Sequence, residues 1–382
     1  MKISKVYITK SSSYLPNDPI SNSEMEKYLG LINGNKSRSK ALVLRSNKIQ
    51  QRYYALTEDG KSTHTNADLT AQAVRKLFSK DTREIEEVDL LCCGTSSPDQ
   101  MMPAHGIMVH GELPEMNSIE VLTPAGNCCS GMHSLKYAYM ALQLNDKKKA
   151  VCTGSERTSI LLRSENYEEE IQMLSKLQDK PYLAFEKDFL RWMLSDGAGA
   201  FLLEKEPNKN GISLEINWIE SVSFANEEKT CMHMAAVKME NGDLKGFGEF
   251  TPQECIDQSI FSMKQDAKQL DGKIVELSFK KIPEIFHKHN LSTKDLSYFL
   301  VHMSSYYFED KIARHWKDLN MPIPKEKWFS NLGTKGNVGA GSIYLMVDEL
   351  FQSGKLNVGE KMLLVVPESA RFAYVYCMLT VC

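Results

Sequence analysis

Residues 88–96 read VDLLCCGTS and residues 296–304 read LSYFLVHMS, and this pair of stretches decides the fold. Each is a continuous apolar run that ends in small polar residues, as expected for a strand buried on both faces of a sheet. Helices cover both faces of such sheets. The two stretches therefore predict an α/β protein in which similar strands recur in the two halves of the chain.

The segments that follow each strand recur in the same order. The first half continues with a helix and two apolar strands, at residues 130–144, 150–154 and 198–204. The second half continues with the same three elements, at residues 339–354, 361–366 and 371–381. We therefore predict a duplicated fold with halves at residues 1–210 and 211–382, whose equivalent strand ends meet at a pseudo-twofold axis.

A charged, helix-prone insertion at residues 163–188 interrupts this plan in the first half. It is interpreted either as a solvated helical cap or as a lid over a substrate tunnel.

The composition is ordinary for a soluble globular protein with a full core. Of 382 residues, 42% are hydrophobic and 25% are charged, and the net charge is −3. These values give no reason to expect nucleic-acid or membrane-surface binding. The sequence contains neither an apolar run of transmembrane length nor a signal peptide, so we expect a cytoplasmic location. The nine cysteines form no CxxC pair, which argues against a metal site, and we read most of them as small buried side chains.

Cys129 is the cysteine whose position favours chemistry. It lies between an apolar segment at residues 119–122 and the helix predicted from residue 130. The unpaired N–H groups and the dipole at a helix start favour a thiolate, which makes this a setting for a nucleophile. Cys128 is a competitor, although adjacent side chains point in different directions. A buried hydrophobe is the alternative interpretation.

His302 and Asn337 are the polar candidates in the second half. His302 ends a buried strand, where side chains of an α/β sheet often form a site, but a satisfied core histidine is the alternative. Asn337 lies in KGNVGAGS at residues 335–342, which no strand leads into directly, so the stretch is not a dinucleotide loop. A helix N-cap is the alternative for Asn337.

The chain contains Cys129, His302 and Asn337 in this order, and in this respect it resembles the β-ketoacyl-acyl-carrier-protein synthase III family of thiolase-fold condensing enzymes. The resemblance spans essentially the whole chain. Two other stretches show it, SYLPNDPISNSEMEKYL at residues 13–29 and SDGAGAFLL at residues 195–203. It implies two βαβαβαββ halves stacked as a five-layer αβαβα sandwich, a homodimer, and no cofactor.

A narrower resemblance is to the dialkylresorcinol-forming ketosynthases of aryl-polyene and flexirubin-type pathways. The stretches that show this resemblance are YLGLINGNKSRSKALVLRSN, IQQRYYAL, CGTSSPDQMMPAH, GSERT and EKDFLRWMLSDGAGA. It implies an enzyme that joins two acyl chains and leads to a cyclised dialkylresorcinol or cyclohexanedione.

The family mechanism implies a role for each matched residue. Cys129 carries the acyl group, and His302 and Asn337 stabilise the thioester enolate that attacks it. The backbone N–H groups of Cys129 and Ala370 are the candidate oxyanion hole. Ala370 lies in PESARF at residues 367–372, where the family carries a glycine run.

Three further features concern the substrates. By resemblance, Met101 and Met102 reach the acyl tunnel of the partner subunit, with ordinary core methionines as the alternative. Carrier-protein docking is expected on one helical face, with a plain solvated face as the alternative, and its candidates are Lys311, Arg314 and Lys317. The tryptophan that stacks coenzyme A in priming members is missing near Arg45. Acyl carrier protein is therefore the expected partner on both sides of the reaction, with acyl-CoA as a second donor.

Other readings of the chain remain open. A fatty-acid-initiating synthase III would use acyl-CoA and malonyl-carrier protein, and a non-condensing acyltransferase would use the same fold. Asn337 disfavours plain acyl transfer, which needs no enolate stabilisation. The intact set of Cys129, His302 and Asn337 disfavours a non-catalytic partner subunit.

Overall fold

The computed structural model describes residues 3–32, 34–37, 39–167 and 189–382. Within these residues backbone hydrogen bonds join ten strands into one sheet, which divides into two sets of five. The first set is β1 (Tyr7–Tyr14), β4 (Leu90–Thr95), β5 (Glu120–Leu122), β6 (Lys149–Glu156) and β7 (Gly197–Glu204). The second set is β8 (Leu214–Ser223), β13 (Tyr298–Val301), β14 (Trp328–Phe329), β15 (Lys361–Glu368) and β16 (Ala373–Val381).

The two sets have the same topology. Their strand orders are β5-β4-β6-β7-β1 and β14-β13-β15-β16-β8, which are equivalent when each set is numbered from its own first strand. In each, the three strands at one end are parallel and the last two pairings are antiparallel. A short antiparallel pairing between β1 and β8 connects them. The predicted duplication is thus present in the sheet.

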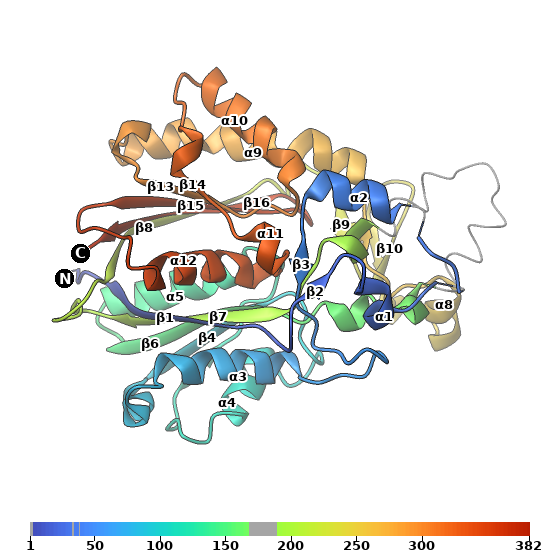
Figure 1. Ribbon diagram of the computed structural model, residues 1–382, viewed down its shortest axis with the longest axis horizontal. Coiled ribbons are helices and arrows are strands. Elements are labelled where there is room, and N and C mark those ends of the chain that lie inside the picture. Colours follow the sequence, from blue (N-terminus) through green and yellow to red (C-terminus); the bar gives the residue numbers. More distant parts are fainter. Residues whose placement is uncertain (1–2, 33, 38, 168–188) are drawn as a thin grey trace.

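Helices form the other three layers. Figure 1 shows α3 (Asn66–Leu77) and α4 (His105–Gly111) on one outer face, and α9 (Ala267–Lys288) and α10 (Glu309–Asp318) on the other. Between the two sets of strands lie α5 (Ser130–Gln143) and α12 (Ser342–Gln352). The predicted five-layer sandwich of the thiolase fold is confirmed.

The middle layer is packed tightly enough to require glycine. A Cβ atom at Gly154 of β6 would lie 2.2 Å from the carbonyl oxygen of Ala340, and one at Gly131 of α5 would lie 2.5 Å from the same atom. The turn before α12 therefore fits directly against β6 and α5. This contact fixes a second-half loop against the first half, beside the start of α5.

Smaller elements complete the described part of the chain. They are β2 (Ile20–Ser21), α1 (Met25–Leu29), α2 (Lys40–Asn47), β3 (Gln51–Arg52), β9 (Met232–His233), β10 (Ala236–Lys238), β11 (Leu244–Gly246), α8 (Pro252–Asp257), β12 (Lys264–Gln265) and α11 (Leu332–Lys335). Figure 1 shows several of them, among them α1, α2 and α8, at one end of the sandwich. No helix in the described ranges is long and apolar enough to cross a membrane.

The helix predicted over residues 339–354 is shorter in the structure. Gly339–Gly341 forms a 3-10 turn in which Gly339 has φ +47°, and α12 follows at Ser342. The predicted boundary after residue 210 falls between β7 and β8, and the division into two domains stays a prediction. Of the predicted insertion at 163–188, residues 168–188 lie outside the described residues.

Candidate active site

A cavity lies between the outer helices α9 and α10 and the carboxyl ends of β13 and β15. It has about 990 Å³ of space free of protein atoms, part of which is open to solvent. One part of its wall is polar and is formed by Asn127, Cys128, Glu156, His302 and Asn337. Most of the remaining wall is apolar, and the side chains that α9 contributes to it include Leu270, Ile274, Val275, Phe279 and Ile282. The cavity can therefore hold an apolar chain beside a small polar centre.

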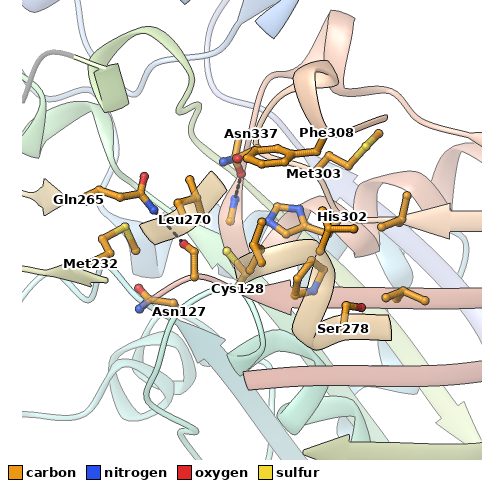
Figure 2. A pocket seen from close by; sticks show the side chains of 18 of the residues that line it. Asn127, Cys128, Met232, Gln265, Leu270, Ser278, His302, Met303, Phe308 and Asn337 are labelled. Carbon is orange, nitrogen blue, oxygen red and sulfur yellow. Dashed lines mark hydrogen bonds between the residues drawn. The ribbon is translucent and has the colours of Figure 1, made fainter. Parts of the chain in front are cut away.

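His302 lies directly after β13 and faces this cavity (Figure 2). Its backbone N–H donates to the carbonyl of Val365 at 2.9 Å, which extends the parallel pairing of β13 and β15 by one residue. The side chain is only 4% exposed, and burial lowers the pKa of His302 to about 4. The ring is therefore neutral near pH 7 and has one N–H to donate.

Asn337 is held by contacts on both its backbone and its side chain. Its N–H donates to the Met193 carbonyl at 3.1 Å, and its carbonyl accepts from the Ser195 N–H at 2.8 Å. The side-chain oxygen Oδ1 accepts the N–H of Gly339 at 2.9 Å. Because Oδ1 is occupied by this bond, the amide NH₂ group is the part of Asn337 left to meet a ligand.

The two adjacent cysteines have different environments. Cys129 is the N-cap residue of α5 and is 2% exposed, with its sulfur 3.2 Å from the carbonyl oxygen of Val366. Cys128 is half-buried and lines the cavity with His302 and Asn337, as Figure 2 shows. The structure therefore brings His302 and Asn337 together with Cys128, and it turns the sulfur of Cys129 toward the β15–β16 hairpin.

The thiol pKa values run against the sequence expectation. A helix start was expected to favour the thiolate of Cys129, but burial, followed by the nearby charge of Glu368, raises the pKa of Cys129 well above its usual value. Burial also raises the pKa of Cys128. Desolvation disfavours the charged form of a thiol, and for both cysteines burial is the largest cause of the shift. Both sulfurs are thiols in this state.

Ala370, the predicted second oxyanion-hole residue, has its N–H engaged within the chain. The N–H donates to Oε1 of Glu368 at 2.5 Å, and the same oxygen accepts from Asn127 Nδ2 at 3.1 Å. Glu368 is 9% exposed, and burial raises its pKa. The turn that follows β15 is thus closed by a buried carboxylate.

The remaining predicted residues lie apart from the polar centre. Met101 and Met102 are 73% and 84% exposed in the single chain and do not line the cavity. On α10, Lys311 is half-buried and paired with Asp271, whereas Arg314 and Lys317 are exposed. Of the three docking candidates, the latter two present their charge to solvent.

Sequence reasoning missed Glu156 and Glu368. Glu156 ends the apolar strand KAVCTGSE of β6 and lines the cavity. A carboxylate at the end of a buried strand is the same signal that pointed to His302, and it would have been sufficient to find Glu156. Glu368 could not be found in this way, because its contacts with Ala370 and Asn127 depend on a turn that only the folded chain forms.

Comparisons with known proteins agree on one family. Residues 286–367 match the model of the 3-oxoacyl-[acyl-carrier-protein] synthase III C-terminal domain. A β-ketoacyl-[acyl-carrier-protein] synthase III of Chlorobaculum tepidum is 24% identical, over 94% of this chain and 95% of that protein. The corresponding protein of Koribacter versatilis is also 24% identical, over 95% and 94%.

Solved structures agree on the fold. The tetronic acid condensing enzyme AbyA1 superposes with a TM-score of 0.76 at 20% identity, covering 98% of this chain and 99% of that one. Xanthomonas campestris OleA, solved with bound lauric acid and lauroyl-CoA, superposes with a TM-score of 0.75 at 16% identity and the same coverage. At this level of identity the likeness concerns the thiolase fold alone.

Proposed function

The chain belongs to the 3-oxoacyl-[acyl-carrier-protein] synthase III family of condensing enzymes, and on that premise we propose that it joins two acyl thioesters by a carbon–carbon bond through an acyl-cysteine intermediate. The observation that carries the proposal is the meeting of His302 and Asn337, from separate second-half segments, with the Cys128–Cys129 pair of the first half. An apolar space adjoins this group. Two hydrogen-bond donors and a thiol beside an acyl-sized cavity are the parts that acyl transfer and enolate chemistry need.

We assign the acyl-carrying sulfur to Cys129, the residue at the start of α5. Its sulfur lies 3.2 Å from the Val366 carbonyl oxygen, so the assignment requires a change of side-chain rotamer that turns the sulfur toward the cavity. In the first step this sulfur attacks the carbonyl carbon of an acyl thioester, and the bond between that carbon and the donor sulfur breaks. The proton of the Cys129 thiol passes to the departing thiolate, so the enzyme is left neutral and acylated.

In the second step another thioester becomes the nucleophile. Its enolate forms when a malonyl-type group loses carbon dioxide or when a β-ketoacyl group loses an α proton. His302, through an imidazole N–H, and Asn337, through its amide N–H, donate to the enolate oxygen. The enolate carbon then bonds to the acyl carbon, and the sulfur of Cys129 departs as the thiolate. Solvent receives the α proton in the β-ketoacyl route, and in both routes the thiolate regains its proton from solvent.

For the substrates, we propose two carrier-bound chains, one of them β-ketoacyl, leading to a dialkylresorcinol or cyclohexanedione. The apolar wall along α9 supports acyl chains, and the missing tryptophan near Arg45 supports carrier protein over coenzyme A. Exposed Arg314 and Lys317 suit an acidic carrier protein. We further propose a cytoplasmic homodimer in which Met101 and Met102 meet the partner subunit.

A second candidate is the initiation of fatty-acid synthesis from acyl-CoA and malonyl-carrier protein. It is favoured by the names of the curated relatives, which are β-ketoacyl-[acyl-carrier-protein] synthases III. Both candidates share the acyl-cysteine step and differ in the second substrate and in the product.

The test separates the two steps. Purified enzyme is incubated with acyl-carrier protein, and its intact mass is followed for an acyl adduct. The second thioester is then added and the product is identified by mass spectrometry. The proposal expects an adduct that the second thioester consumes; a protein that forms no adduct with acyl-carrier protein or acyl-CoA is not this enzyme. A cyclised product supports the two-chain reaction, and a linear β-ketoacyl chain supports the second candidate.

A further inference from the structure

The carboxylate of Glu156 joins two loops beside the polar end of the cavity. Its Oε1 accepts the N–H of Ser96 at 3.1 Å and the N–H of Ala340 at 3.2 Å. Its Oε2 accepts the hydroxyl of Ser97 at 2.5 Å. Because Glu156 ends β6 in the first half and Ala340 lies in the second, one side chain links the two halves at the site.

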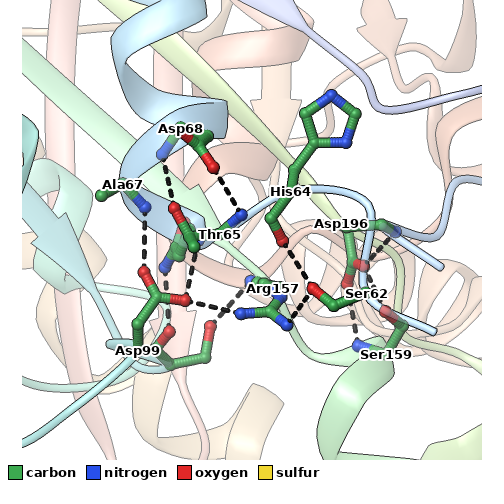
Figure 3. Close-up of polar contacts among 12 residues, drawn as sticks. Ser62, His64, Thr65, Ala67, Asp68, Asp99, Arg157, Ser159 and Asp196 are labelled. Carbon is green, nitrogen blue, oxygen red and sulfur yellow. Dashed lines mark hydrogen bonds and ion pairs between the residues drawn. The ribbon is translucent and has the colours of Figure 1, made fainter. Parts of the chain in front are cut away.

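The first-half side of this link is braced by an ion pair. The Arg157 N–H donates to the Ser97 hydroxyl at 2.8 Å, and the Arg157 guanidinium donates to Asp99 at 2.8 Å. Figure 3 shows Asp99 between Arg157 and the start of α3, where it also accepts two backbone N–H groups. The hydroxyl that donates to Glu156 is therefore held in place, and so is the carboxylate.

The second-half side of the link leads to Asn337. Gly339, at φ +47°, packs against the Glu156 side chain so closely that a Cβ atom there would lie 2.8 Å from Oε1. The same glycine donates its N–H to Oδ1 of Asn337. Anchoring Ala340 fixes the peptide that follows Gly339, and the position of Gly339 fixes which end of the Asn337 amide is free.

We propose that Glu156 is a positioning residue that holds the 337–340 turn, so that Asn337 presents its amide N–H group to the enolate. The inference rests on the proposed function, because it concerns the step in which the enolate forms. It assigns Glu156 no part in the loading of Cys129, which needs no donor from Asn337. It also assigns the carboxylate no proton transfer, since its two oxygens are occupied by fixed donors.

Two substitutions separate length from charge. Glu156→Asp keeps the charge but is one methylene shorter, so it cannot reach both Ser96 and Ala340. Glu156→Gln keeps the length, so its amide oxygen can still accept from Ala340 while its NH₂ group donates to the Ser97 hydroxyl. A positioning role therefore predicts that the charged variant fails and the neutral one works, which is the opposite of what an acid–base role predicts.

The experiment measures both steps on the full-length enzyme: acyl loading by intact mass, and condensation by product formation from the preloaded enzyme. Asp348→Asn is the matched control, because Asp348 is a buried carboxylate that accepts from Ser11 and Ser13 outside the cavity wall. For Glu156→Asp we expect condensation to fall by about tenfold or more while loading stays within about threefold of the wild type. For Glu156→Gln and the control we expect both steps to stay within about threefold.

Four results would overturn the inference. If Glu156→Asp condenses at the wild-type rate, Glu156 has no positioning role. If loading and condensation fall equally in this variant, the role of Glu156 is only structural. Loss of condensation in Glu156→Gln makes Glu156 an acid or base instead. If the wild type itself forms no acyl adduct, the proposed function fails first, and the inference fails with it.

Discussion

The backbone N–H of Ala370 donates to the carboxylate of Glu368, with 2.5 Å between nitrogen and Oε1. This bond closes the turn between β15 and β16, where the family resemblance implies a glycine run. It also places a buried negative charge near Cys129, whose pKa is raised first by burial and then by Glu368. In this arrangement burial and Glu368 both favour the neutral thiol of Cys129, and the N–H of Ala370 is already engaged within the chain.

Replacing Glu368 should make the thiols more reactive. A neighbouring anion disfavours the thiolate, so Glu368→Gln should lower the pKa of Cys129 and of Cys128, which the same charge raises. The rate of iodoacetamide labelling of the peptide that contains both cysteines should then rise at neutral pH, and its pH profile should move to lower pH. Asp348→Asn is the control, and an unchanged profile would count against electrostatic control by Glu368.

The two cysteines should behave differently when replaced singly. Cys129→Ala should abolish the acyl adduct, whereas Cys128→Ala should still load, because only Cys129 sits at the start of α5. Loss of the nucleophile should lower condensation by about 10³-fold or more. Intact mass after incubation with acyl-carrier protein decides the matter. An adduct that persists in Cys129→Ala and disappears in Cys128→Ala would move the nucleophile to the cysteine that lines the cavity.

Acid should destabilise the protein partly through His302. Burial lowers its pKa from 6.5 to about 4. Between these two pH values the unfolded chain binds a proton on this residue, whereas the folded chain does not. The contribution of neutral His302 to the free energy of unfolding is fully present above pH 6.5, and it is lost as the pH falls from 6.5 toward 4. At the acid end the loss is at most about 3 kcal/mol.

Denaturant unfolding of wild type and His302→Gln at neutral and acidic pH measures this contribution. The variant should lose less stability on acidification than the wild type does. His105 is the internal comparison, since burial lowers its pKa to about 4 as well and its contribution remains in the variant. Equal acid sensitivity of the two proteins would show that His302 is not the group responsible.

A bulky residue at Ser278 should shorten the acyl chain that fits. Ser278 lines the cavity from α9 and is 5% exposed, so Ser278→Trp projects its ring into the apolar space. Adduct formation with long acyl chains should fall by about tenfold or more, and acetyl loading should persist. Glu276→Trp, on the exposed side of the same helix, is the matched control. Equal loss of short and long chains would indicate general damage to the fold.

Charge reversal on α10 should weaken carrier-protein binding without touching the chemistry. In Arg314→Glu with Lys317→Glu, KM for acyl-carrier protein should rise about tenfold, and KM for a small acyl thioester should stay unchanged. Lys311, which is paired with Asp271, should matter less. Parallel kinetics with the two donors provide the check, and an equal effect on both would exclude a docking role.

The sequence by itself determined the plan of the fold. The apolar runs at residues 88–94 and 296–301 are continuous because each strand is covered on both faces, and β4 and β13 lie at equivalent places in the two sets of strands. The local sequence pattern is sufficient to predict such strands, because a strand buried on both faces is a continuous apolar run and does not alternate between apolar and polar residues. The same logic located His302, because a strand end is a position that sequence can mark.

Tertiary structure alone decided how the site is arranged. Which of two adjacent sulfurs faces the cavity depends on the β15–β16 hairpin, whose residues lie more than two hundred positions away along the chain. The raised pKa of Cys129 is likewise caused first by its burial and then by Glu368, which a distant segment brings near it. The link from Glu156 to Ala340 crosses the two halves. Sequence specifies what each segment buries, whereas the orientation of each buried polar group depends on the partner that a distant segment brings to it.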